Sequence, residues 1–137
     1  MSEIIFFMFP DKIELKGNQD TPSVIFDKEA QYFEISGRSF PADADGFYQP
    51  LLKWLDDFKS TMPKEKMVLN VKMDYFNTAS AKMLLDLFFK LEDFKDQNIE
   101  TLIKWHYLEE DDDMLEAGEE FKEIVELDFE FVEIIES

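Results

Sequence analysis

The stretch from Met67 to Tyr75 constrains the fold more than any other part of the chain. Apolar and polar residues alternate through it, which is typical of a strand with one buried face and one solvated face. From about Ser80 to Lys95 the apolar residues change to a helical period. The apolar face of the strand consists of Met67, Leu69, Val71, Met73 and Tyr75, and the stripe of the helix of Leu84, Leu87, Phe88, Leu91 and Phe94. A strand that leads into a helix predicts an α/β fold.

The rest of the chain repeats this pattern. We expect strands at Lys12–Leu15, Ser23–Asp27, Gln31–Ser36, Ile99–Leu108 and Leu127–Ile135, and helices at 45–61 and 113–125. The turn at 27–30 predicts that the second and third of these strands pair antiparallel. Pro50 either begins the first helix or kinks it. The 137 residues predict a single α/β domain, 1–137, with a mixed sheet and about three helices mainly on one face.

Residues 1–11 form an apolar extension whose role the sequence leaves open. Its run IIFFMF, at 4–9, is predicted to be a buried or edge strand. Six apolar residues are too few to cross a bilayer, and Glu3 stands where a secretory signal carries positive charge. We therefore expect a cytoplasmic protein that does not insert into membranes.

The net charge of −18 limits the partners of the chain. It repels the phosphates of nucleic acids and disfavours an anionic membrane surface. It favours association with a basic partner surface. A plain acidic interaction scaffold with no switch is the simplest alternative that fits this charge.

The sequence contains few of the residues and motifs on which catalytic sites are built. It has no Cys, a single His at position 106, and four glycines that form no phosphate-binding loop. We therefore expect no enzyme activity, no catalytic residue, no metal site and no cofactor. The acidic run Glu109–Asp113 leaves one alternative open, a hydrolase or ligand-binding protein that depends on a divalent cation. The run equally suits a helix start, at which Asp112 or Asp113 would be the cap.

The junction between the alternating strand and the second helix is a further candidate site. Thr78 stands where a helix cap is expected, with its hydroxyl oxygen facing free backbone N–H groups. The same geometry suits a phosphate group, because exposed amides and the helix dipole stabilise negative charge. Lys82 follows one helical turn later, within reach of such a phosphate.

Five further stretches follow one another along the chain. They are Thr21–Asp27, Glu34–Pro41, Phe47–Leu55, Tyr75–Thr78, and Trp105–Tyr107 with the acidic run that continues to Glu119. In this order they resemble the SiaC family of bacterial regulatory phosphoproteins, and the similarity runs from about Lys12 to Phe131. The resemblance implies a fold similar to STAS domains, which are partner-switching modules of the anti-anti-sigma type. It also implies a protein that is not an enzyme and whose partner binding changes on reversible phosphorylation.

The family's phosphorylated hydroxyl is the Thr of an Asn-Thr pair, which is Thr78 here. Ala79 and Ala81 replace hydroxyls that the family often carries, so Ser80 is the one alternative. Asn77 and Lys82 are the residues expected to support the phosphate. The resemblance implies a cognate Ser/Thr kinase and phosphatase as partners, and a diguanylate cyclase as the output of one branch. The predicted docking face is the outer side of the second helix, at Lys82, Leu85, Asp86 and Phe89.

Overall fold

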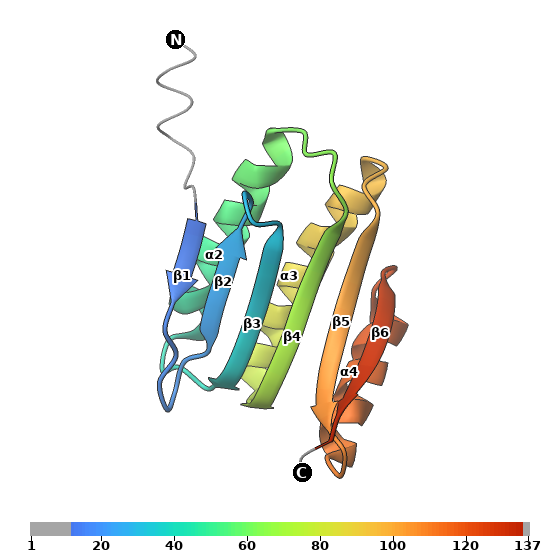
Figure 1. The fold of residues 1–137 in the computed structure, drawn as a ribbon. Coiled ribbons are helices and arrows are strands. Elements are labelled where there is room, and N and C mark those ends of the chain that lie inside the picture. Colours follow the sequence, from blue (N-terminus) through green and yellow to red (C-terminus); the bar gives the residue numbers. More distant parts are fainter. Residues whose placement is uncertain (1–11, 136–137) are drawn as a thin grey trace.

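Six strands and three helices follow one another in a computed structural model that describes residues 12–135 (Figure 1). The strands are β1 (Lys12–Leu15), β2 (Ser23–Asp27), β3 (Tyr32–Ser39), β4 (Met67–Phe76), β5 (Thr101–Leu108) and β6 (Asp128–Ile134). The helices are α2 (Ala44–Ser60), α3 (Thr78–Asp96) and α4 (Asp112–Ile124). The predicted strand at 4–9 lies outside the described residues.

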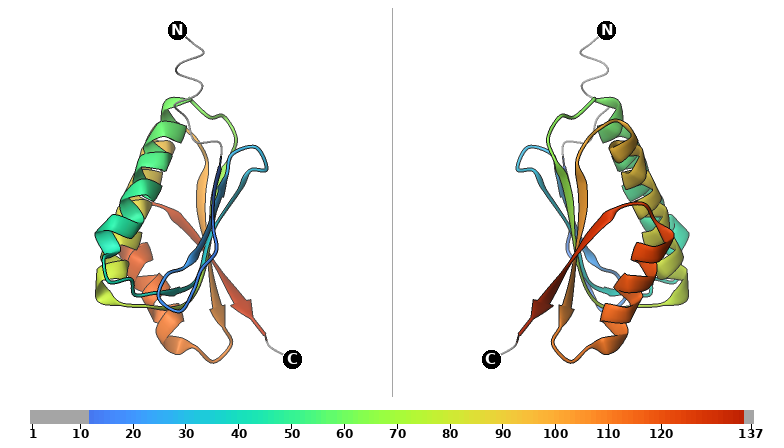
Figure 2. Two further views of the ribbon diagram at one scale, coloured as in Figure 1. Left: turned by 90° about the vertical axis from the view of Figure 1, so that its left-hand side faces the viewer. Right: turned by 90° about the vertical axis from the view of Figure 1, so that its right-hand side faces the viewer.

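The strands form one mixed sheet in which spatial order equals chain order, β1 to β6. β1, β2 and β3 pair antiparallel, as the predicted hairpin requires, and β3 to β6 pair parallel. Each parallel step advances in the same direction, so right-handed crossovers bring all three helices to one face. Figure 2 shows α2, α3 and α4 on the same side of the sheet. The predicted mixed α/β domain with helices on one face is therefore confirmed.

The core lies between the sheet and the helices. The alternating apolar residues of β4 from Met67 to Met73 are buried in it, as predicted. One residue of the pattern was predicted wrongly. Tyr75 was expected to face the core, yet 44% of it is exposed. The cause is a shift in register between β3 and β4, in which Gly37 pairs with Met73 but Arg38 pairs with Tyr75. Asp74 is left without a partner on β3 and forms a β-bulge in β4. Gly37, opposite the bulge, has a φ of 96°.

Helix α2 begins six residues before Pro50 and continues through it, so Pro50 is not its start. Asp43 caps the helix, and its side chain accepts a hydrogen bond from the Gly46 N–H at 2.9 Å. The inner side of α2 contributes Trp54, which packs against Phe26 and Phe33 of the first hairpin. α2 lies beside α3, and together they cover most of the antiparallel half of the sheet and its centre (Figure 1).

Candidate functional site

The junction between β4 and α3 is built around Asn77. Its side-chain oxygen accepts a hydrogen bond from the Ser80 N–H at 2.9 Å, and its carbonyl accepts one from the Ala81 N–H at 2.9 Å. Asn77 is therefore the helix cap, and Thr78 is the first residue of the helix. The expectation that Thr78 is the cap was wrong by one position. Asn and Thr both cap helices well, and here the amide of Asn77 takes the role.

Thr78 and its neighbour Ala79 are both exposed. Their amides precede Ala81, whose N–H donates to the Asn77 carbonyl, so they lie in the first turn, where a helix has no partners for its N–H groups. The first turn of α3 also carries no acidic residue. The positive end of this helix dipole is therefore free of compensating side-chain charge, which is the environment that a phosphate prefers.

Ser80, the alternative acceptor, points into the protein. None of its surface is exposed. Its hydroxyl oxygen accepts a hydrogen bond from the Ser39 hydroxyl at 2.7 Å, and Ser39 is also 2.7 Å from the Tyr48 hydroxyl. Burial raises the pKa of Tyr48, so this chain of three hydroxyls stays neutral. A kinase has no access to Ser80 in this fold. The sequence held the signal, because Ser80 stands four residues before Leu84 and continues the inner stripe of α3.

Lys82 lies in the second turn of α3, with its Nζ 3.4 Å from a carboxylate oxygen of Asp86. This ion pair points along the helix away from Thr78. Leu85 is partly buried and packs against the core, whereas 41% of Phe89 is exposed. Support of a phosphate by Lys82 therefore stays a prediction, as does docking on this side of α3.

A groove of about 480 Å³ separates the outer surfaces of α2 and α3. Its lining is Gln49, Leu52, Lys53, Asp56, Asp86, Phe89, Lys90 and Asp93. Two of the four predicted docking residues, Asp86 and Phe89, therefore line it, and Lys82 and Leu85 do not. The sequence analysis missed the side contributed by α2. Neither stripe indicates which helix lies beside which, so no signal in the sequence could have found it.

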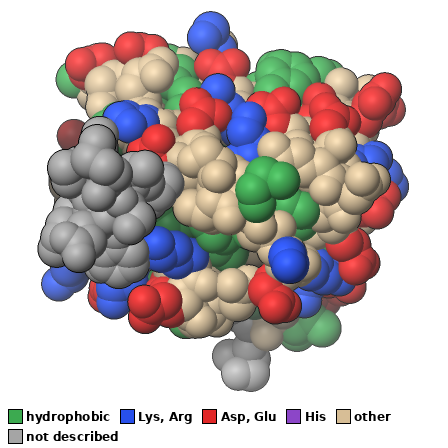
Figure 3. All heavy atoms as spheres, turned by 90° about the horizontal axis from the view of Figure 1, so that it is seen from above, with side chains coloured by type: hydrophobic (Ala, Val, Ile, Leu, Met, Phe, Trp, Pro, Cys, Tyr) green, Lys and Arg blue, Asp and Glu red, His purple; other side chains and the backbone are tan. Residues whose placement is uncertain are grey.

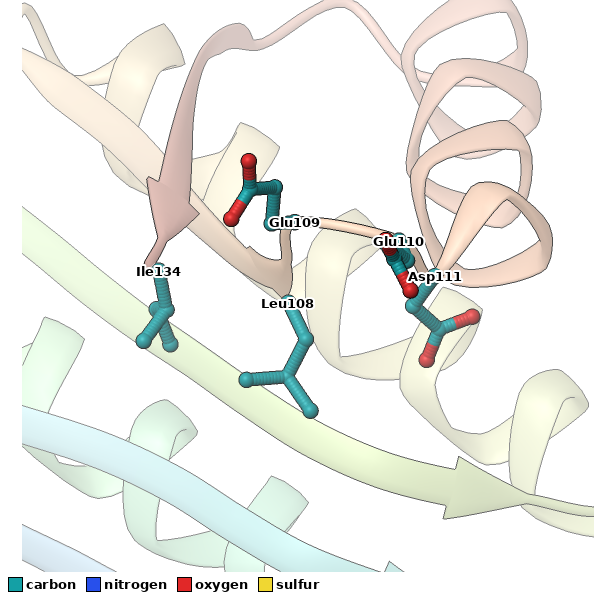
Figure 4. Close-up of a pocket in the computed structure, with 5 residues that line it drawn as sticks. All are labelled: Leu108, Glu109, Glu110, Asp111 and Ile134. Carbon is teal, nitrogen blue, oxygen red and sulfur yellow. The ribbon is translucent and has the colours of Figure 1, made fainter. Parts of the chain in front are cut away.

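The junction between β5 and α4 contains the acidic run. Asp111 is the cap, and its side chain accepts a hydrogen bond from the Met114 N–H at 3.0 Å. The expected caps, Asp112 and Asp113, instead occupy the first turn. A pocket of about 560 Å³ lies beside this loop, lined by Leu108–Asp111 and Ile134. Figure 4 shows the carboxylates of Glu109 and Asp111 pointing in different directions. Within residues 12–135 no group of three or more potential metal ligands comes together.

His106 is half-buried on the face of the sheet opposite the helices. Its Nε2 lies 3.3 Å from the side-chain oxygen of Asn70 on β4. Burial lowers the pKa of His106, and the neighbouring Lys72 and Lys104 lower it further. The hydrogen bond joins it to an amide and not to a nucleophile, so His106 has the surroundings of a structural residue.

Known proteins resemble this chain in both sequence and fold. Residues 15–134 match the sequence model of the family described as SiaC family regulatory phosphoprotein. The chain belongs to the SiaC family. An uncharacterized protein of Pseudomonas aeruginosa (strain UCBPP-PA14) is 25% identical to this SiaC-family protein over 111 residues, which cover 81% of this chain and 87% of the relative.

Solved structures share the fold. SiaC of Pseudomonas aeruginosa superposes with a TM-score of 0.82 at 23% identity, over 91% of this chain and 100% of that one. A crystal structure from the same organism contains the diguanylate cyclase SiaD in complex with its activator SiaC. It matches with a TM-score of 0.83 at 24% identity, over 89% of this chain and 99% of that one. In the described part of this SiaC-family protein, no helix has the length and apolar character needed to cross a membrane.

Proposed function

We propose that this SiaC-family protein is a cytoplasmic regulator without enzyme activity, and that phosphorylation of Thr78 switches its binding to a partner. One observation carries the proposal. Thr78 presents an exposed hydroxyl at the start of α3, whose first turn carries no acidic residue, whereas α2 and α4 carry Asp45 and Asp112–Asp113 there. A chain of net charge −18 thus keeps this helix start neutral.

The chemistry of the position supports reversible phosphorylation. A phosphate adds about 1.5 to 2 negative charges. At Thr78 that charge meets the positive end of α3 and two free amides, so the fold tolerates it. The change is therefore local to the surface, where it alters what the protein binds and leaves the core intact.

A solved complex of a similar protein supports the proposed partner class. SiaC of Pseudomonas aeruginosa is the activator of the diguanylate cyclase SiaD in their solved complex. We propose that the unphosphorylated form of this chain likewise binds and activates a diguanylate cyclase, and that a cognate Ser/Thr kinase and phosphatase set the state of Thr78. Helix α3 and the groove beside it, with the exposed ring of Phe89, form the proposed docking face.

Substitutions at Thr78 test the switch. Thr78→Asp supplies part of the phosphate charge and should weaken binding to the cyclase tenfold or more. Thr78→Ser should bind as the parent does and accept phosphate. Thr78→Ala should also bind and should fold with nearly the parent stability, because Asn77 provides the cap. Affinity by calorimetry and free energy of unfolding by urea denaturation are measured on all three.

Ser60→Asp is the matched control, since it places the same charge on an exposed hydroxyl residue at the far end of α2. It should leave binding unchanged. If Thr78→Asp binds the cyclase as tightly as the parent, the switch at Thr78 is wrong. Equal binding by every variant, together with no phosphate on the protein isolated from its host, would instead describe an acidic scaffold.

A further inference from the structure

Arg38 is the single arginine of the chain, and it is held in an unusual way. Its guanidinium carbon lies 5.3 Å from the ring centroid of Phe40 and 5.3 Å from that of Tyr75. The two rings meet edge to face, with centroids 5.8 Å apart. Arg38 is exposed, and its side chain makes no hydrogen bond or ion pair with any residue from 12 to 135. In a chain with 32 acidic residues, its N–H donors thus have no partner among the described residues.

The fold places this arginine beside the candidate phosphorylation site. Arg38 precedes Ser39, whose carbonyl accepts a hydrogen bond from the Asn77 N–H at 3.1 Å, and Thr78 follows Asn77. The C-terminal ends of β3 and β4 lie side by side (Figure 1). Since consecutive Cα atoms are about 3.8 Å apart and neighbouring strands about 4.8 Å apart, the Cα atoms of Arg38 and Thr78 are at most about 13 Å apart. Extended arginine and phosphothreonine side chains span that distance together.

The bulge between β3 and β4 creates this arrangement. In a regular strand without a bulge, Tyr75 would share the core-facing side of β4 with Met73. With the bulge, Tyr75 becomes the register partner of Arg38 and leaves the core. The bulge therefore brings the ring of Tyr75, three residues before Thr78, to the surface beside Arg38. Bulges often redirect a side chain next to a functional site.

We propose that Arg38 receives the phosphate group of Thr78 through two parallel hydrogen bonds. This inference rests on the proposed phosphorylation and names the residue that responds to it. The planar fork of a guanidinium matches the oxygens of a phosphate, which a lysine ammonium does not. Stacking on exposed rings is worth only about 0.5–1 kcal/mol, so Phe40 and Tyr75 hold the guanidinium near the junction and release it to a stronger ligand.

The response changes the docking surface. When the phosphate takes the guanidinium, the rings of Phe40 and Tyr75 lose the cation between them, and the ends of β3 and β4 become tied to the start of α3. The surface beside Thr78 thus loses a free positive charge at the same time as it gains a negative one. The switch therefore reverses the local charge, and does not merely add to the acidity of the chain.

A single arginine makes this proposal directly measurable, because the ¹⁵N spectrum of the protein contains one Arg Nε–H signal. The full chain is prepared with phosphothreonine incorporated at position 78 during synthesis, so that no kinase is needed. Relative to the unphosphorylated chain, the Nε–H signal should move and exchange more slowly with water. It should also titrate with the same midpoint as the ³¹P signal of the phosphate.

Variants of Arg38 separate the effect of the planar guanidinium from the effect of its positive charge on the phosphate pKa. Arg38→Gln should raise the second pKa of the phosphate by about half a unit, because a neighbouring cation favours the dianion. Arg38→Lys should raise it less. Lys64→Gln is the matched control, since it removes one exposed positive charge at the opposite end of β4 and should leave this pKa unchanged.

Two outcomes keep this inference apart from the proposed function. If the Nε–H signal does not move and Arg38→Gln has no more effect than Lys64→Gln, the phosphate receptor is wrong, even where phosphorylation still blocks binding to the cyclase. If the signal moves as expected but phosphorylated and unphosphorylated chains bind the cyclase equally, the Arg38 contact stands and the proposed switch falls.

Discussion

The junctions β4–α3 and β5–α4, at each of which a parallel strand turns into a helix, have the same backbone design and opposite electrostatics. In both, an Asn or Asp side chain caps the helix by accepting a hydrogen bond from the amide three residues on, at 2.9 Å for Asn77 and 3.0 Å for Asp111. The first turn of α4 then adds Asp112 and Asp113, whereas the first turn of α3 adds Thr78 and no charge. One junction carries its negative charge permanently, and the other presents an uncharged hydroxyl, which is the proposed site of phosphorylation.

The same contrast extends over the molecule. Residues 109–137 contain 14 acidic residues and one lysine, so they hold −13 of the net charge of −18. The end of the protein at which β4 begins, seen from above in Figure 3, instead mixes basic and acidic side chains. A phosphate on α4 would add little to a surface that is already acidic. On α3 it would place charge on a helix start whose first turn carries no acidic residue.

The largest expected effect comes from the packing of α4. A Cβ atom built on Gly118 would lie 2.6 Å from two atoms of the Trp105 ring and 2.8 Å from the ring of Phe131. Gly118→Ala should therefore destabilise the protein by about 1–3 kcal/mol, more than the helix propensity of Ala returns. Urea denaturation measures it, with the exposed neighbour Glu119→Ala as the control, expected within about 0.5 kcal/mol of the parent. A more stable Gly118→Ala would mean that α4 does not pack this closely.

The two caps should be worth nearly the same. Asn77→Ala and Asp111→Ala should each cost about 1 kcal/mol of the free energy of unfolding, because each exposes an amide that the side chain now satisfies. Thr78→Ala and Asp112→Ala, one residue later, should cost less. If Thr78→Ala proves as costly as Asn77→Ala, the cap at the first junction is shared between the two residues and their separate roles do not hold.

The helix dipoles should respond to charge with opposite signs. Asp112→Asn and Asp113→Asn should each remove about 0.3–1 kcal/mol at low salt, while Thr78→Asp should add a similar amount at α3. Both effects should shrink in 1 M salt, where the Debye length is about 3 Å. Thermal unfolding at two salt concentrations measures them. A destabilising Thr78→Asp would contradict the view that α3 begins without compensating charge.

The smallest effect concerns the hydrogen bond between His106 and Asn70, which links the strands that lead to the two junctions. Because burial lowers the pKa of His106 in the folded state, the unfolded chain binds the proton more readily. The contribution of neutral His106 to the free energy of unfolding should therefore be complete above a pH of about 6.5 and decrease as the pH falls below it. Denaturation at pH 7.5 and 5.5 should show a decrease smaller than either cap effect, and His106→Gln should reduce it. An equal decrease in His106→Gln would assign it to the carboxylates.

The fold could be predicted from the sequence because the hydrophobic periodicity of its strands and helices identifies them. The alternation of β4 and the stripe of α3 each repeat over several turns or pleats, so the errors at their ends do not change the topology. Where several residues can do the same work, the sequence does not choose. Asn77 and Thr78 are both good caps, as are Asp111, Asp112 and Asp113, and the choice depends on the residue at which the backbone turns.

The candidate site was predicted less completely for a related reason. Thr78 followed from the family resemblance, and the structure shows its exposure. Arg38 was missed as a member of the site, because it lies forty residues earlier and reaches Tyr75 only through the register of β3 and β4. A bulge shifts every side chain after it to the other face of the sheet. Asp74 is polar and Tyr75 is apolar, as in a regular alternating strand, so the sequence gives no sign of the bulge.

The strand order has a consequence for how the protein forms during synthesis. Because each strand pairs with the one that precedes it in the chain, every strand leaving the ribosome meets a partner that is already outside. No pairing waits for the C-terminus, which keeps loop closures short and the contact order low for a sheet of this size. The end that carries Thr78 can then be in place, with Thr78 exposed, before the acidic α4–β6 segment has been translated.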